Sequence, residues 1–226
     1  MKTILFYVLS LCTGLVIFWG LPLLGWGIRE IPSFFDSPAR LTYTIVILLL
    51  QIFGILYNPQ VGRNKEDRKS GVKKHKIDLF LIQIFSISIV LVAPFSDNHL
   101  TGVLDISETI RFLGFIFVIP GFILMQMAEK YLDIQFSIEV TIQKNHKLIQ
   151  DGPYKFIRHP RYLGIITFFM GISIVFRSLL SIFLVIALCI VLIWRVYTEE
   201  SLMHQEFGTE WEIYCKKSWR MIPFVF

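Results

Sequence analysis

The sequence predicts an all-α fold: a polytopic integral membrane protein with about six transmembrane helices, a C-terminal helical hairpin and a cytoplasmic interfacial helix. Hydrophobic residues make up 54% of the 226 positions and charged residues 17%, below the roughly 25% typical of soluble domains. The apolar residues form long runs, and about 20 of them in a helix cross the hydrocarbon core of a bilayer. We therefore expect a single membrane domain over 1–226, with four membrane helices in 1–128 and the hairpin in 129–226.

Six apolar segments define the expected helices: 3–26, 40–57, 77–95, 109–128, 162–176 and 179–197. The first segment follows Lys2, but its apolar part is too long for a signal peptide and no small-residue cleavage site precedes Pro32. We therefore expect a retained helix there. The fifth segment is short and ends at Arg177 and Ser178, which predicts a tight hairpin with the sixth.

Charge in the loops predicts the orientation. The loop over 62–76 contains seven basic and two acidic residues, which accounts for the whole net charge of +5. Since cytoplasmic loops carry an excess of Lys and Arg, we place this loop inside. The acidic loop 96–108 then lies outside, and the basic region 130–161 and both termini are cytoplasmic. The loop 62–76 lacks the interleaved aromatic residues of nucleic-acid sites, so we expect membrane lipids as partners and no nucleic acid.

The regions that flank the hairpin are more polar than the spans. Residues 130–150 predict a short interfacial helix and loop that end at Gly152 and Pro153. Beyond residue 199, apolar residues recur at intervals of four, four and three: Met203, Phe207, Trp211 and Tyr214. This spacing predicts an amphipathic helix under the membrane domain, which could also close the floor of a site.

Few other residues suggest a separate site. Cys12, Cys189 and Cys215 are far apart, so the sequence predicts neither a metal site nor a disulfide framework. Gln51 and Arg177 are polar residues at membrane depth or its edge, and the sequence offers no partner for them. A channel or transport subunit would line several spans with polar residues, so this alternative is weak.

The stretch Gly152–Gly164 reads GPYKFIRHPRYLG and is the most informative part of the chain. Pro160 suits the first turn of a helix, so we expect the fifth helix to begin there, with N–H groups that favour an anion. The sixth helix returns to the same face of the membrane. Hairpin geometry should therefore bring several polar side chains together: Tyr154, Arg158, His159, Tyr162, Arg195, Glu199 and Glu200.

This group of polar side chains offers charges of both signs to a ligand. Carboxylates can accept hydrogen bonds from ribose hydroxyls or an ammonium group, and arginine can bind a carboxylate through two hydrogen bonds. Tyr154, Tyr162 and Trp194 can cover an adenine face. S-adenosylmethionine has a ribose, a zwitterionic end and a sulfonium, and it therefore fits a site made of these side chains. Taken singly, each residue also has an ordinary explanation, such as interfacial anchoring, a solvated helix end or, for Gly164, close helix packing.

The motif from Leu148 to Gly164, followed by the pair Glu199 and Glu200, resembles the signature of the isoprenylcysteine carboxyl methyltransferase family. Related membrane phospholipid methyltransferases share this pattern. Two later segments, Phe207–Tyr214 and Arg220–Pro223, also fit, so the resemblance covers about 145–226. It implies an integral membrane methyltransferase that uses S-adenosylmethionine, with 129–226 as the catalytic region and the hairpin binding the cofactor.

The resemblance also implies roles for individual residues. Arg158 and Glu199 are the expected catalytic residues. The expected cofactor-binding residues are Tyr154, His159, Tyr162, Gly164, Glu199 and Glu200. Arg161 stands where the family often has a small or apolar residue, so the shape and charge of the substrate entrance are open.

The resemblance implies O-methylation of the carboxylate of a prenylated cysteine or a similar lipid-like substrate. A carboxylate is already ionised at neutral pH, so alignment and desolvation suffice, whereas an amine substrate would need a proton acceptor. A phospholipid N-methyltransferase is therefore an alternative. Another is an NADPH-dependent reductase of the sterol reductase type, whose ending is similar to Phe207–Cys215, although the pair Glu199 and Glu200 argues against it. The sequence carries no signal for an oligomeric state.

Overall fold

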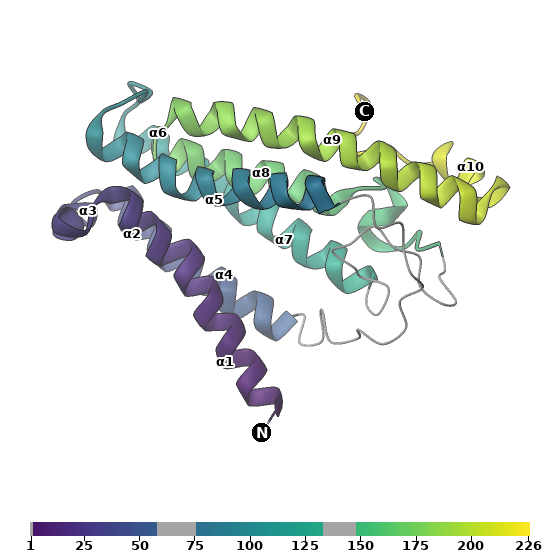
Figure 1. Cartoon of the computed structure of the whole chain (residues 1–226), viewed down its shortest axis with the longest axis horizontal. Helices are drawn as coiled ribbons and strands as arrows, with labels where there is room; N and C mark the ends of the chain where they lie inside the picture. The colour runs from purple at the N-terminus through teal and green to yellow at the C-terminus, as the bar shows by residue number, and fades with distance from the viewer. Residues whose placement is uncertain (1, 58–75, 133–147) are drawn as a thin grey trace.

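The computed structural model describes residues 2–57, 76–132 and 148–226, and the regular elements in these ranges are helices (Figure 1). In chain order they are α1 (Lys2–Leu15), η1 (Val16–Gly20), α2 (Leu21–Trp26), η2 (Ile28–Glu30), α3 (Ile31–Phe34), α4 (Pro38–Tyr57), α5 (Lys76–His99), α6 (Glu108–Arg111), η3 (Phe112–Gly114), α7 (Phe115–Leu132), η5 (Gly152–Lys155), α8 (Pro160–Val175), α9 (Leu179–Phe207) and α10 (Thr209–Cys215). Helix α8 packs against α7 and α9, and α5 runs along α9, while α1 and α2 cross this layer obliquely (Figure 1). The predicted all-α membrane fold is confirmed.

Five helical runs in the described ranges are long and apolar enough to cross a membrane: Val8–Trp26, Pro38–Tyr57, Ile77–His99, Glu108–Leu132 and Leu179–Phe207. The remaining expected span, the fifth in chain order, is α8, which is apolar but has only 16 residues. Ten of these sixteen residues are buried, so protein rather than lipid surrounds most of this helix. The six expected spans therefore correspond to five long apolar helices and one short buried helix, and the number that cross a membrane stays a prediction.

The first helical run changes its hydrogen-bond pattern where α1 gives way to the π-helical turn η1. Pro22 has no N–H group to donate to the carbonyl of Phe18 one turn earlier. The hydroxyl of Tyr43 in α4 donates to that carbonyl instead, at 3.2 Å. The irregular turn is thereby satisfied by a neighbouring helix. The expected helix over 3–26 is observed as one continuous helical run, and its retention stays a prediction.

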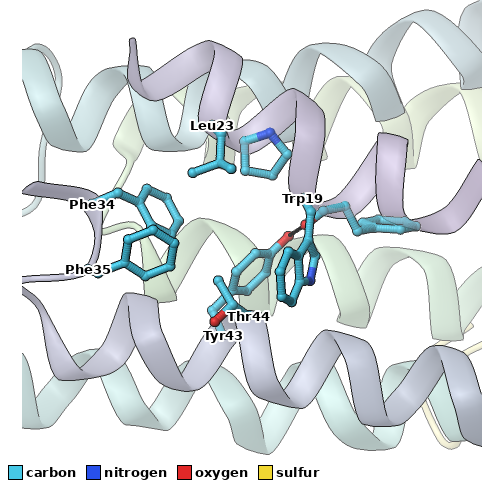
Figure 2. A pocket seen from close by; sticks show the side chains of 8 residues that line it. Trp19, Leu23, Phe34, Phe35, Tyr43 and Thr44 are labelled. Atoms are coloured by element: carbon cyan, nitrogen blue, oxygen red, sulfur yellow. Dashed lines mark hydrogen bonds between the residues drawn. The ribbon is translucent and has the colours of Figure 1, made fainter. Parts of the chain in front are cut away.

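A small apolar pocket lies beside this turn. Figure 2 shows Trp19, Leu23, Phe34 and Phe35 around it, with Tyr43 below. Its volume is about 10 Å³, which is at most the space of one water molecule. The pocket is too small for a substrate, so it is a packing defect between α2, α3 and α4.

Helices α7 and α8 approach each other through glycines. A Cβ atom on Gly164 would lie 2.7 Å from the carbonyl oxygen of Gly121, and one on Gly171 would lie 2.6 Å from that of Gly114. The run η3–α7 and helix α8 thus each present two glycines seven residues apart, and small residues of this kind let membrane helices touch at the backbone. Close helix packing was one explanation that the sequence left open for Gly164, and the structure shows such packing against α7.

Helix α9 is longer than expected. It continues to Phe207, ten residues past the predicted end at 197, because residues 199–206 are mostly strong helix formers. The expected interfacial helix is therefore divided: Met203 belongs to α9, whereas Trp211 and Tyr214 belong to α10. Gly208 separates the two helices with a φ of 50°, a backbone conformation that favours glycine.

An ionic cluster at the beginning of α9 corrects two expectations. Asp97 was expected in an outer loop, but α5 extends over it and its side chain is fully buried. Arg177, for which the sequence offered no partner, donates to Asp97 Oδ1 through Nε at 2.6 Å. The Asp97 cluster consists of Arg40, Asp97, Glu108, Arg111 and Arg177.

Two expectations lie partly or wholly outside the described residues. These are the basic loop over 62–76 and the interfacial helix over 130–150. The inside and outside assignments that depend on them stay predictions. Gln51 packs against Gly14, and no hydrogen-bond partner for its side chain lies within the described ranges.

Candidate active site

The segment before α8 is held by the segment after α10. The amide of Trp219 donates to the carbonyl of Phe156 at 2.9 Å, and the amide of Arg158 donates to that of Trp219 at 2.7 Å. The amide of His159 donates to the carbonyl of Arg220 at 2.9 Å. This short parallel pairing brings a residue near the C-terminus beside the Arg158–His159 pair.

Glu200 lies between two arginines. Its Oε1 accepts from Arg158 Nε and its Oε2 accepts from Arg220 Nε, both at 2.8 Å. Arg158 Nη1 also donates to the carbonyl of Ser218 and, at 3.4 Å, to that of Cys215. Arg158 therefore joins α9 to the chain after α10, while its carboxylate partner is buried.

Glu199 faces the first turn of α8. It accepts a hydrogen bond from the hydroxyl of Tyr162, and Arg195 Nε lies 3.1 Å from the same oxygen, Oε1. Arg195 Nε also lies 2.7 Å from the Tyr162 hydroxyl. The side chain of Glu199 is 21% exposed, so this carboxylate is anchored and still partly open.

His159 lies between the two carboxylates. Its Nδ1 is 3.5 Å from Glu199 Oε2 and its Nε2 is 3.5 Å from Glu200 Oε1. The ring is parallel to that of Tyr162, with centroids 5.6 Å apart. Nε2 is buried and has no hydrogen-bond partner among the described residues. Burial disfavours the charged imidazole, but the two carboxylates outweigh it and raise the pKa of His159 above its ordinary value.

An open cavity of about 580 Å³ adjoins this group. Arg158, Glu200 and Arg220 lie on its wall, together with the aromatic side chains of Tyr197 and Trp211. Small-molecule sites commonly have volumes of roughly 300–1,000 Å³ and combine apolar walls with a few polar groups. The cavity thus has the size and lining of a ligand site, with both signs of charge.

The structure brings together six of the residues that the sequence singled out. Arg158 and Glu200 line the cavity, and the adjoining layer contains His159, Tyr162, Arg195 and Glu199. The hairpin therefore does join the two motifs at one end of α8 and α9. Their roles toward a ligand stay predictions.

Two other predicted residues face α7. Tyr154 is buried, and its hydroxyl donates to the carbonyl of Ala128 at 3.3 Å. Its own carbonyl accepts from the hydroxyl of Tyr214 at 2.6 Å. Burial raises the pKa of Tyr214 to about 12, and it also raises the pKa of Tyr154. Both hydroxyls therefore stay neutral hydrogen-bond donors. Tyr154 and Gly164 thus pack against α7 and are not among the residues that line the cavity, and their role toward a cofactor stays a prediction.

Sequence reasoning missed Arg220 as a site residue. The late segment Arg220–Pro223 had been noted as part of the motif, but its position beside Glu200 depends on the fold. Arg161 also has a defined position, since its Nε donates to Glu129 Oε1 of α7 at 2.9 Å. Among the described residues no group of three or more histidine, cysteine or acidic side chains could hold a metal ion.

Comparison with known proteins gives consistent matches. The family model described as the isoprenylcysteine carboxyl methyltransferase (ICMT) family matches residues 113–205. A probable protein-S-isoprenylcysteine O-methyltransferase of Oryza sativa subsp. indica is 30% identical over 140 residues, which cover 57% of this chain and 71% of the relative. Protein-S-isoprenylcysteine O-methyltransferase B of Arabidopsis thaliana is 29% identical over 119 residues, covering 50% and 58%. The Schizosaccharomyces pombe protein-S-isoprenylcysteine O-methyltransferase is 33% identical over 87 residues, covering 36% and 35%.

Proposed function

The chain belongs to the isoprenylcysteine carboxyl methyltransferase family, and on this premise we propose that it transfers the methyl group of S-adenosylmethionine to the carboxylate of a prenylated cysteine. One observation carries the proposal. Two arginines and two adjacent glutamates surround a buried histidine beside a cavity of about 580 Å³. The relatives described above are methyltransferases, which favours methyl transfer over the reductase that the sequence left open.

The residues around the cavity fit S-adenosylmethionine. The buried Nε2 of His159 has no hydrogen-bond partner within the described ranges and lies 3.5 Å from Oε1 of Glu200, which lines the cavity. Glu199 and Glu200 supply carboxylates for an ammonium group or ribose hydroxyls. Tyr197 and Trp211 offer aromatic faces to an adenine. When bound, S-adenosylmethionine supplies a methyl group on a positively charged sulfonium, which suits in-line transfer to an anionic oxygen.

Arg220 is the residue that fits the substrate carboxylate. Its Nε is paired with Glu200, its side chain is 33% exposed, and no side chain in the described ranges accepts from its two terminal amino groups. A guanidinium binds a carboxylate through two parallel hydrogen bonds. Arg158 is engaged by Glu200 and by backbone carbonyls, so we assign it the task of holding the wall of the site. Arg220 then orients the substrate.

The chemistry asks little more of the protein than alignment. A cysteine carboxylate is ionised at neutral pH and needs no base to become a nucleophile. Holding the nucleophile and the methyl donor in line, away from water, lowers the barrier by removing most of the entropy cost. Glu199, through its contacts with Tyr162 and Arg195, keeps one side of the site fixed during this step.

The position of the cavity along α9 suits a lipid-like substrate. Tyr197 lies 18 residues beyond the start of α9, which is about 27 Å at a rise of 1.5 Å per residue. The hydrocarbon core of a bilayer is about 30 Å thick. The cavity therefore lies near a bilayer boundary, where a prenyl chain can stay in the hydrocarbon while its cysteine reaches Arg220. We propose that this boundary is the cytoplasmic one, in agreement with the charge pattern of the loops.

Calorimetry tests the donor half of the proposal. We expect S-adenosylhomocysteine to bind to the detergent-purified protein and NADPH to give no heat of binding. Binding of NADPH without binding of S-adenosylhomocysteine would overturn methyl transfer in favour of the reductase.

A transfer assay tests the acceptor half. The protein is incubated with methyl-labelled S-adenosylmethionine and an S-farnesyl cysteine that has a free carboxylate. We expect a labelled product from which mild base releases methanol, because only an ester is base-labile. The matched carboxamide should give no product. Base-stable label on an amino phospholipid would instead identify an N-methyltransferase.

A further inference from the structure

The first turn of α5 carries a buried carboxylate that belongs to neither motif. Asp78 is 2% exposed, and its Oδ2 accepts from Arg195 Nη1 of α9 at 2.8 Å. Arg195 is itself 3% exposed, so the pair is shielded from water. Because each charge would be strongly destabilised without the other, the pair sets the position of both side chains.

The same arginine reaches the candidate active site through a different nitrogen. Arg195 Nε lies 2.7 Å from the hydroxyl of Tyr162 and 3.1 Å from Glu199 Oε1. The guanidinium is planar and rigid. Holding Nη1 on Asp78 therefore sets the plane of the group and the direction in which Nε donates.

The arrangement also divides one positive charge between two carboxylates. With Asp78 on Nη1, Arg195 contacts Glu199 through Nε at Oε1, and the other oxygen of Glu199 lies 3.5 Å from His159 Nδ1. If Asp78 lost its charge, Arg195 could turn two nitrogens toward Glu199, as arginine does with an isolated carboxylate. That turn would draw the carboxylate away from His159.

We infer that Asp78 is a positioning residue for the methyl-donor site, acting through Arg195 to hold Glu199 toward His159. The inference rests on the proposed function, since it assigns Glu199 and His159 to the methyl donor. Asp78 lies outside residues 113–205, which the family model matches. A helix of the N-terminal half thus contributes to a site whose other residues belong to the C-terminal half.

The test compares Asp78→Asn with the wild type and with a matched ion-pair variant, Arg177→Gln. Arg177→Gln removes a 2.6 Å ion pair at the other end of α5 and leaves Arg40 and Arg111 on Asp97. For Asp78→Asn we expect the KM for S-adenosylmethionine to rise about tenfold or more, because displacement by about 1 Å can cost up to a hundredfold. The KM for S-farnesyl cysteine should change less than threefold. Arg177→Gln should leave both values unchanged, while thermal melting in detergent reports the stability of each variant.

A second variant covers the case in which Asp78→Asn does not fold. Asp78→Glu keeps the charge and moves the carboxylate by one methylene, so we expect a smaller rise of about threefold in the KM for the donor. An unchanged donor KM in the folded Asp78 variants overturns the inference, and so does an equal rise in Arg177→Gln. Failure of the wild type to bind S-adenosylhomocysteine overturns the proposed function itself, which separates the two failures.

Discussion

Two ionic networks of similar composition lie at opposite ends of α9, and they differ in what they leave unused. In the Asp97 cluster, three arginines surround one fully buried carboxylate, at 3.2 Å, 2.5 Å and 2.6 Å. At the other end, two arginines bind Glu200, but a nitrogen of His159 has no partner among the described residues and Arg220 is one-third exposed. A cavity adjoins the second network. Unused hydrogen-bonding groups beside a cavity therefore mark the network around Glu200 as a candidate ligand site, whereas the Asp97 cluster is a structural clamp that joins helices.

The Asp97 cluster acts as a clamp because its members come from separate elements. Arg40 lies in the first turn of α4, Asp97 in the last turn of α5, and Arg111 at the end of α6. Arg177 lies in the turn between α8 and α9, and Arg111 Nε also donates to the carbonyl of Val175 at 2.7 Å. The cluster therefore fixes one end of the bundle, and this rigidity holds the helices that carry the site at the other end.

Asp97→Asn should give the largest loss of stability. It leaves Arg40, Arg111 and Arg177 near a neutral side chain, and removal of one partner from a buried ion pair costs about 3–5 kcal/mol. We expect a large fall in the thermal midpoint in detergent, with the affinity of the remaining folded protein for S-adenosylhomocysteine unchanged. A loss of ligand affinity without a loss of stability would contradict the division into clamp and site.

Arg220→Gln should give the largest loss of activity for a small loss of stability. The variant removes the guanidinium that we assign to the substrate carboxylate, and a loss of about a hundredfold in kcat/KM corresponds to about 2.7 kcal/mol. Lys217→Gln is the matched control, because it removes the same charge from an exposed neighbour. Steady-state assays with S-farnesyl cysteine should separate the two variants. Equal effects would mean that general charge at the cavity, rather than Arg220, governs substrate binding.

Gly164→Ala tests whether this glycine belongs to the bundle or to the site. The new Cβ would lie 2.7 Å from the carbonyl oxygen of Gly121, so α7 and α8 must separate, at a cost of about 1–3 kcal/mol. Gly20→Ala is the control, since its nearest atom would be 3.9 Å away. We expect a lower thermal midpoint for Gly164→Ala alone, with donor affinity retained in the folded protein. A fall in donor affinity at full stability would favour the cofactor role that the resemblance implied.

The sequence could predict the site to the extent that local pattern determined it. Pro160 predicted the start of α8, and the two apolar lengths predicted that Glu200 would return to Arg158, as it does. The partners of Asp78 and Arg177 could not be predicted, because these contacts join residues 117 and 80 positions apart and depend on how α5 packs.

The orientation of α8 could not be predicted from its hydrophobic pattern either. Nearly all its residues are apolar, so no amphipathic stripe indicates which face meets α7 and which meets α9. The pattern therefore could not indicate that Gly164 packs against α7. Arg220 could not be predicted as a site residue for a related reason, because a short backbone pairing between distant segments brings it to Glu200.

A pH titration should give the smallest effect, and it separates the two networks by their chemistry. The folded protein holds the proton on His159 more tightly than the unfolded chain does, because Glu199 and Glu200 raise its pKa above the ordinary value of about 6.5 in spite of its burial. The stabilisation is therefore fully present below pH 6.5 and is lost as the pH rises through the higher folded pKa. We expect the thermal midpoint of the wild type to fall over this window more than that of His159→Gln.

The Asp97 cluster contains no histidine, so Arg177→Gln should be less stable yet keep the wild-type dependence of the thermal midpoint on pH. Parallel curves for the wild type and His159→Gln would mean that the carboxylates do not hold the proton, and that Nε2 faces the ligand as a neutral group.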